Sequence, residues 1–108
     1  MPATHLLIVI AEVDEEVEAD WNRWYDEVHL PDATACPGVL SGRRFCSVGE
    51  ITHNDRGTRA PALGRVYTTI YELAGPEAVN TLEFHKMRGW AHFTPSVRSS
   101  TRVVRALA

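Results

Sequence analysis

The spacing of apolar residues changes abruptly at Asp14, and this change constrains the fold more than any other feature of the chain. Residues 5–13 form an apolar, β-branched run of the length of one strand. Over residues 15 to about 29 the apolar positions instead recur with helical spacing. Asp14 can cap this helix, and Leu30-Pro31 ends or kinks it because the residue before a proline avoids the α region. Five residues fall within an arc of roughly 100° and form the predicted buried face: Val17, Trp21, Trp24, Tyr25 and Val28.

The rest of the chain carries further strand and helix signals. Residues 37–38 (Pro-Gly) indicate a turn, residues 50–62 a polar loop, and residues 75–85 a second helix that begins at Gly-Pro. Three more strands are predicted, at about 39–48, 64–73 and 97–107. The order β-α-β-β-α-β is the ferredoxin-like arrangement of an α+β protein: a four-stranded antiparallel sheet with two helices on one face. The other face, if apolar, needs a partner, so we expect a two-fold homodimer with its sheets face to face.

Length and composition limit the classes of protein that fit. The 108 residues make one predicted domain, 1–108, which buries roughly 65% of its unfolded surface. A net charge of −3 argues against nucleic acid as a partner. The longest apolar run, Leu6 to Ala11, is too short to span a membrane, and the first residues lack a basic secretory region, so we expect a cytoplasmic protein. Two cysteines, Cys36 and Cys46, exclude a disulfide scaffold.

The densest chemistry lies on the first predicted helix. Trp21 and Trp24 offer flat apolar walls on which a planar substrate can stack. Tyr25 and His29 are four residues apart and can reach the same space, where His29 would move a proton and Tyr25 would stabilise an oxyanion. The alternative is structural: the indoles are core, and His29 caps the last carbonyls of the helix. A deep apolar pocket reached by both His29 and Tyr25 would favour the enzyme.

This segment resembles a known family. The pattern W-x-x-W-Y-D-x-x-H-x-P over residues 21–31, followed by P-G and by R-R-F on the next strand, is similar to the EthD-like branch of the dimeric α+β barrel superfamily. The resemblance implies a homodimer with one pocket per subunit, between the sheet and the helices. That superfamily includes cofactor-free monooxygenases, polyketide cyclases, muconolactone-type isomerases, decarboxylases and haem-degrading enzymes. A likeness of fold does not choose among these reactions.

Two further histidines are candidates beside this motif. His5, in THLLIVI, is similar to the first-strand histidine of the plant polyketide-cyclase members of the superfamily, and His85 lies roughly where their second catalytic histidine lies. The alternative for each is a histidine at the surface or at a strand end.

Strand residues supply the remaining candidates. Alternation places Arg43 and Arg44 on opposite sheet faces, so one of them points toward the helices or toward the dimer interface. A guanidinium there would clamp a carboxylate or enolate of an anionic substrate, or else pair with the acidic first helix. Tyr67 and Tyr71 share one strand face and line the cavity or the dimer seam, and Trp90 closes the core or forms the pocket mouth.

These features predict a small cofactor-independent enzyme that uses acid/base chemistry, as an isomerase, cyclase or lyase (decarboxylase), on a cyclic or aromatic oxygenated metabolite. No histidine pair has metal-ligand spacing, so no metal ion is predicted, although a haem ligand among the histidines stays open. The alternatives are a cofactor-free monooxygenase and a non-catalytic dimer that binds a small ligand or stabilises a larger enzyme. The residues assigned to catalysis are His29, Tyr25 and His85; those assigned to substrate binding are Trp21, Trp24, Arg44, Tyr67, Tyr71 and Trp90.

Overall fold

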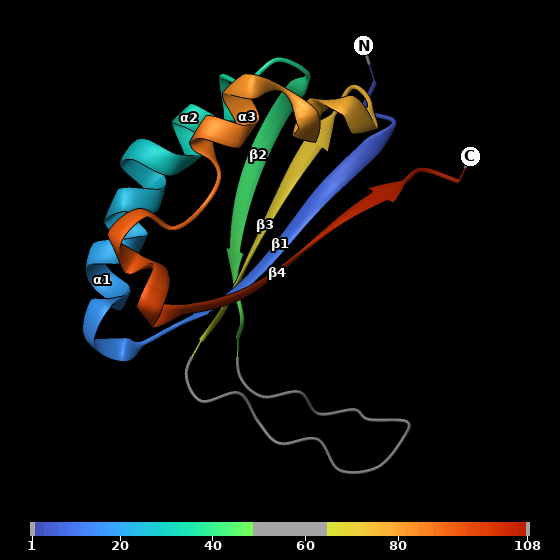
Figure 1. The fold of residues 1–108 in the computed structure, drawn as a ribbon. Helices are drawn as coiled ribbons and strands as arrows, with labels where there is room; N and C mark the ends of the chain where they lie inside the picture. Colours follow the sequence, from blue (N-terminus) through green and yellow to red (C-terminus); the bar gives the residue numbers. More distant parts are fainter. Residues whose placement is uncertain (1, 49–64, 108) are drawn as a thin grey trace.

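A single antiparallel sheet organises the computed structural model, which describes residues 2–48 and 65–107. The sheet order is β2-β3-β1-β4, and all helices of the described chain lie on one face (Figure 1). The four strands are β1 (His5–Val13), β2 (Val39–Cys46), β3 (Val66–Leu73) and β4 (Val97–Arg105). The predicted α+β, ferredoxin-like class is therefore confirmed. The predicted polar loop, 50–62, lies outside the described residues.

The first helix is longer than predicted and is interrupted by a wider turn. It consists of α1 (Glu15–Trp24), the π-helical turn η1 (Tyr25–His29) and α2 (Leu30–Thr34), so it continues through Pro31 instead of ending near His29. Proline has no N–H to donate, and its ring conflicts with the carbonyl four residues back. The π turn directly before Pro31 widens the helix at that point, with the Leu30 N–H donating to the Tyr25 carbonyl five residues back.

The π turn changes which side chains face the sheet. Each residue advances an α-helix by about 100° but a π turn by roughly 80°, because more than four residues share one turn. Over the four residues after Tyr25 this difference turns His29 inward by roughly 70°. His29 is accordingly 7% exposed and Val28 is 45% exposed. The prediction that Val28 belongs to the buried face is therefore wrong, and His29 takes its place.

The second helical region is two short pieces instead of one helix. A 3₁₀ turn, η2 (Pro76–Asn80), is followed by α3 (Leu82–Met87), and Thr81 between them has extended backbone. The Thr81 hydroxyl accepts the Phe84 N–H at 3.1 Å, so Thr81 is the N-cap of α3. At the first helix Asp14 does occupy the N-cap position, but its carboxylate accepts a hydrogen bond from Arg98 and does not cap the helix.

Two apolar clusters fill the space between the sheet and the helices. One lies under α2 and α3 and includes Tyr71, Leu73 and Phe84. The other lies under α1 and includes Trp21 and Tyr25. Trp90, in the segment between α3 and the 3₁₀ turn η3 (Ala91–Ser96), packs against both clusters.

The opposite sheet face carries no helix in the described chain and has a group of apolar side chains. Alternation directs the side chains of seven apolar residues to this open face: Leu6, Ile8, Ile10, Phe45, Val66, Ile70 and Val104. Ile10 and Phe45 are each 43% exposed. Within the described residues, no helix has both the length and the apolar character needed to cross a bilayer.

Candidate active site

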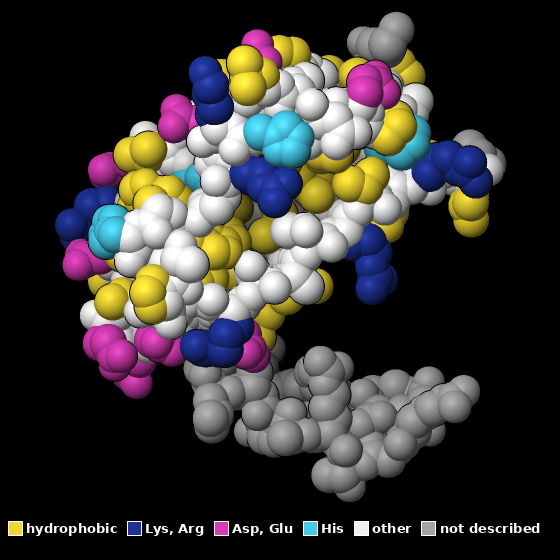
Figure 2. Space-filling model, in the orientation of Figure 1, with side chains coloured by type: hydrophobic (Ala, Val, Ile, Leu, Met, Phe, Trp, Pro, Cys, Tyr) yellow, Lys and Arg dark blue, Asp and Glu magenta, His cyan; other side chains and the backbone are white. Residues whose placement is uncertain are grey.

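A cavity of about 430 Å³ opens between the sheet and the helical segments. It lies where the two core clusters meet, and its walls come from β1, β3, β4, η1, η2, α3 and the segment that follows α3. Figure 2 shows the corresponding hollow between α3 and β4, with hydrophobic side chains gathered in it. Six lining residues are aliphatic or aromatic without a polar group: Leu7, Val9, Val79, Phe84, Met87 and Val103. Its size and apolar walls are typical of sites for small organic molecules.

His29 reaches this cavity from the π turn and packs against two indoles. The Trp24 ring stacks on the imidazole, with ring centroids 4.6 Å apart and an interplanar angle of 19°, and the Trp90 centroid lies at 5.4 Å. Burial is the main cause that lowers the pKa of His29 to about 4; Asp32 opposes this shift and the Arg44 charge adds to it. The imidazole is therefore neutral at pH 7, with a ring nitrogen able to accept a proton.

Two tyrosine hydroxyls meet beside the histidine. The Tyr25 and Tyr71 oxygens are 3.1 Å apart in a buried hydrogen bond, and both residues line the cavity. Burial raises the pKa of both phenols, so both are protonated at neutral pH. In such a pair one hydroxyl donates to the other, and the acceptor's own O–H is free to donate to a ligand. The Tyr25 ring lies edge-on to His29, with centroids 4.8 Å apart.

Arg44 supports Tyr25 from behind instead of entering the cavity. The β2–β3 register pairs Arg44 with Thr69 on the helix side of the sheet, whereas Arg43 lies on the open face. The Arg44 guanidinium carbon is 4.2 Å from the Tyr25 ring centroid, which is a cation–π contact. The same guanidinium donates to Asp26 at 2.6 Å and to Asn22 at 2.7 Å. The interpretation as an ion pair with the first helix is the one that the structure supports.

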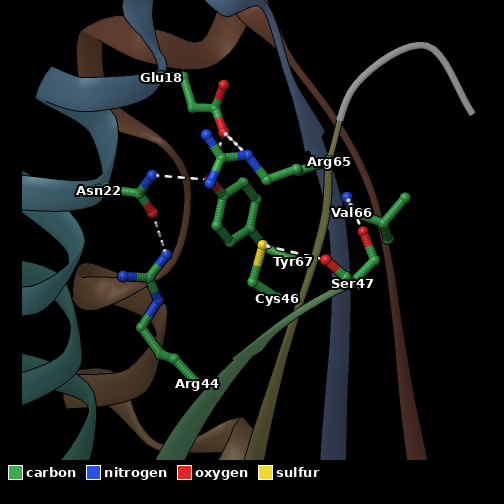
Figure 3. A network of polar contacts seen from close by, with 8 residues as sticks. All are labelled: Glu18, Asn22, Arg44, Cys46, Ser47, Arg65, Val66 and Tyr67. Atoms are coloured by element: carbon green, nitrogen blue, oxygen red, sulfur yellow. Dashed lines mark hydrogen bonds and ion pairs between the residues drawn. The ribbon is translucent and has the colours of Figure 1, made fainter. Parts of the chain in front are cut away.

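Tyr67 belongs to the same polar network and does not line the cavity. Asn22 stands between Arg44 and Tyr67 and donates to the Tyr67 hydroxyl at 3.0 Å (Figure 3). The Tyr67 hydroxyl in turn donates to Glu18, whose carboxylate also pairs with Arg65 at 3.3 Å. This network fastens α1 to β2 and β3 and thereby fixes the position of the π turn.

The structure brings together some of the residues predicted for the site and separates others. His29, Tyr25, Tyr71 and Trp90 line the cavity. Trp24 lies behind His29, and Trp21 is fully buried, with 0% exposure, in the core against Tyr25 and Tyr67.

The two other histidine candidates lie away from the cavity. His85 is exposed on α3, because the buried Phe84 precedes it and the helix turns it outward. His5 lies at the start of β1, where its Nδ1 is 2.8 Å from the Thr4 hydroxyl. The structure therefore separates both from the tyrosine pair.

The sequence interpretation missed the wall formed by β4. Ser99, Thr101 and Val103 line the cavity, and the Trp90 indole N–H donates to the Ser99 hydroxyl at 2.9 Å. Alternation at 99, 101 and 103 was the available signal for a shared face. Within residues 2–48 and 65–107, no group of His, Cys, Asp or Glu is arranged to hold a metal ion.

Comparison with known proteins gives the fold a context. No family model matches the sequence, and no curated protein matches it. The chain is similar in structure to HapK from Hahella chejuensis, with 12% identity, a TM-score of 0.63 and coverage of 95% of this chain and 92% of HapK. A mutant of SnoaB, a cofactor-independent oxygenase from Streptomyces nogalater, matches with 12% identity, a TM-score of 0.58 and coverage of 98% and 96%. An ethyl tert-butyl ether D (EthD) family protein from Bacillus halodurans matches with 12% identity, a TM-score of 0.57 and coverage of 95% and 99%.

These likenesses establish the fold. The chain has the ferredoxin-like fold of the dimeric α+β barrel proteins, and an EthD family protein is among its structural neighbours. The resemblance drawn from the helix motif is thus confirmed for the fold. At 12% identity the reaction has to be argued from the site itself.

Proposed function

We propose that this chain is a small, cofactor-independent enzyme that transfers a proton within a cyclic or aromatic oxygenated substrate. One observation carries the proposal: His29 and the Tyr25–Tyr71 hydroxyl pair line one apolar cavity, beside the Trp90 indole. A filled core with His29 capping backbone would have favoured a purely structural role. The cavity instead combines a proton acceptor, hydrogen-bond donors and an aromatic wall.

The proposed reaction begins with the neutral imidazole. His29 accepts a proton from a carbon next to a substrate carbonyl, and the electron pair moves onto the carbonyl oxygen to give an enolate. A tyrosine O–H donates a hydrogen bond to that oxygen, and the Arg44 charge behind Tyr25 favours this donation by lowering the phenol's pKa relative to burial alone. His29 then returns the proton to another atom of the substrate, which completes an isomerisation.

The low pKa of His29 is compatible with a role as proton acceptor only when a negatively charged intermediate lies beside the imidazole. In the empty cavity His29 is a weak base because burial disfavours the imidazolium. A developing enolate in the cavity stabilises the imidazolium by direct attraction, as the Asp32 charge does to a smaller extent. Proton transfer is therefore coupled to oxyanion formation, and it is disfavoured without substrate. His85, exposed on α3, has no part in this scheme.

Deuterium exchange tests this proposal without knowledge of the natural substrate. A panel of cyclic ketones is incubated in D₂O, and exchange next to the carbonyl is followed by NMR. The wild type should accelerate exchange in at least one member, and His29→Gln should lose about 10²–10⁴-fold of that acceleration. Tyr25→Phe should also slow exchange, whereas His85→Gln, a change at an exposed histidine, should not. Equal exchange by the wild type and His29→Gln would show that His29 is not the base.

A cofactor-free monooxygenase is the second candidate. It is favoured by the structural likeness to SnoaB, which is described as a cofactor-independent oxygenase. An enolate held under indole rings would here react with O₂ instead of taking back its proton. Oxygen-electrode measurements separate the two: uptake stoichiometric with substrate supports the oxygenase, and turnover under argon supports the isomerase.

We also propose that the open sheet face is the interface of a homodimer. The face carries Ile8, Ile10, Phe45 and Ile70 close together on three adjacent strands. Large apolar side chains that are 43% exposed, such as Ile10 and Phe45, gain stability when a second sheet covers them. A two-fold axis that lies in the interface, parallel to the two sheets, lets each chain cover the open face of the other.

A further inference from the structure

The charged groups on the cavity wall are all basic. Two of the lining residues are arginines, Arg88 and Arg102, and no aspartate or glutamate lines the cavity in the described chain; His29 is neutral at pH 7. The whole chain carries a net charge of −3, so this wall is opposite in sign to the protein. A cavity with low-dielectric walls and positive charges concentrates anions from solution.

Arg88 reaches the wall through an unusual stretch of backbone. It follows α3 in extended conformation, Gly89 has φ +106°, and Ala91 has φ +52°. A Cβ built on Gly89 would meet nothing within 4 Å, so its backbone angle, and not a close contact, favours glycine there. Through this turn three consecutive residues, Arg88, Gly89 and Trp90, line the cavity. A non-glycine residue at positive φ costs free energy and is concentrated at functional sites.

Arg88 has no acidic partner among the residues that the structure describes. Ion pairs engage Arg23, Arg44, Arg65 and Arg98 there, whereas Arg88, like Arg43, Arg102 and Arg105, is in none of them. Arg88 is exposed at the mouth of the cavity, and the amide side chain of Asn80 belongs to the same wall. A guanidinium without an acidic partner, beside an amide donor, is suited to bind a carboxylate.

The second arginine of the wall is less well placed. Arg102 pairs with Ile8 in the β1–β4 register, and alternation directs both side chains toward the open face of the sheet. It borders the cavity from the edge strand, between Thr101 and Val103. This placement distinguishes Arg88 as the residue with a guanidinium available to a ligand.

We propose that the cavity binds an aromatic or cyclic carboxylate, with the ring against Trp90 and the carboxylate on Arg88 at the mouth. The inference rests on the proposed function and deepens it, because it names the group that holds the substrate's charge in the cavity that His29 lines. Arg88 thereby takes the role that the sequence had suggested for Arg44, whose guanidinium is engaged by Asp26 and Asn22. The carboxylate orients the ring so that the reacting carbon faces His29 and the tyrosine pair.

A matched pair of ligands tests this assignment. Naphthoate and naphthamide share one ring system and differ in charge, and their binding is measured by isothermal titration calorimetry. The wild type should prefer naphthoate by roughly tenfold or more, which is what one charge-assisted hydrogen bond contributes. Raising NaCl from about 50 to about 500 mM should reduce that preference through screening. Equal binding of the two probes, or no binding of either, overturns the proposal.

Variants locate the charge that acts on the ligand. Arg88→Gln should abolish the preference for naphthoate, and Arg88→Lys should restore part of it. Arg23→Gln, a change on the exposed face of α1, should leave the preference unchanged. Loss of the preference in Arg102→Gln but not in Arg88→Gln would overturn the assignment to Arg88.

The catalytic proposal for His29 can be tested separately from carboxylate binding by Arg88. His29→Gln should lose deuterium exchange and still prefer naphthoate, because Arg88 is intact. A wild-type protein that prefers naphthoate through Arg88 but exchanges no deuterium in any ketone would retain this inference and reject the catalytic proposal. If the protein exchanges deuterium but binds naphthoate and naphthamide equally, the catalytic proposal is retained and the assignment of Arg88 is rejected.

Discussion

Acidification should destabilise the protein through one buried group, His29. The folded state holds the pKa of this imidazole at about 4, against an ordinary value of 6.5. The unfolded chain exposes the ring to water and binds a proton at the ordinary pKa. Between these two values the unfolded state therefore carries more protons than the folded state, and its relative population rises as pH falls.

The size of the effect follows from the two pKa values. The free energy of unfolding should fall by up to about 1.4 kcal/mol per pH unit inside the window. A pKa lowered from 6.5 to about 4 corresponds to about 3 kcal/mol in total. No loss from this group is expected above about pH 7. A loss of about 3 kcal/mol is a large part of the 5–15 kcal/mol typical of a folded domain.

Urea unfolding at several pH values measures this directly. Tryptophan fluorescence follows the transition, and protein concentration is held constant because an oligomer's stability depends on it. Carboxylates in ion pairs also titrate in this range, so the wild type is compared with His29→Gln at every pH. Between pH 7 and pH 4 the free energy of unfolding of the wild type should fall by about 3 kcal/mol more than that of His29→Gln.

A matched control separates burial from histidine content. His85→Gln and His92→Gln remove exposed histidines and should show the same pH dependence as the wild type. If His29→Gln also parallels the wild type, the imidazole does not remain neutral in the folded state. The burial and the proton-accepting role argued for His29 would then both be wrong.

Three further predictions concern the frame of the site and the open face. Gly42→Ala should destabilise the protein by about 1–3 kcal/mol in urea unfolding, because its Cβ would lie 2.8 Å from the Tyr71 ring and 2.9 Å from Leu30; an unchanged midpoint would contradict this packing. Arg44→Met should cost about 1–3 kcal/mol, since it breaks the contacts with Asp26 and Asn22, while Arg23→Met, at an exposed residue of α1, should stay within about 0.5 kcal/mol. Equal effects of the two changes would refute the supporting role of Arg44. Ile8→Asp should convert the proposed dimer to a monomer in light scattering, whereas Leu82→Asp, at a 66% exposed residue on α3, should not; a dimeric Ile8→Asp would place the interface elsewhere.

The positions of Tyr25 and His29 could be predicted from the sequence in part. The four-residue spacing of Tyr25 and His29 correctly predicted that both reach one space. The α-helical projection, however, placed Val28 inside and His29 at the margin, because the spacing of apolar residues alone does not distinguish an α turn from a π turn. A proline two residues after His29 was the available signal, since a helix that continues through proline has to widen or bend before it.

The roles of the two arginines at the site could not be assigned from sequence. Alternation predicted that Arg43 and Arg44 face opposite sides, and the register confirms it. Which of the two faces the helices depends on the pairing of β2 with β3. Arg88 enters the cavity wall only through the backbone angles at Gly89 and Ala91. Neither is a local property of the chain.

Sequence alone determined the strands and their order, because alternation, β-branching and turn residues act over neighbours in the chain. It also determined that aromatic rings crowd the inner face of the first helix. Only the tertiary structure decided that Trp21 fills the core while Trp90 lines a cavity, since both are large apolar rings with the same local preference. Whether a ring packs against protein or borders empty space depends on what the other strands and helices bring to the opposite side, and residues distant in sequence supply that.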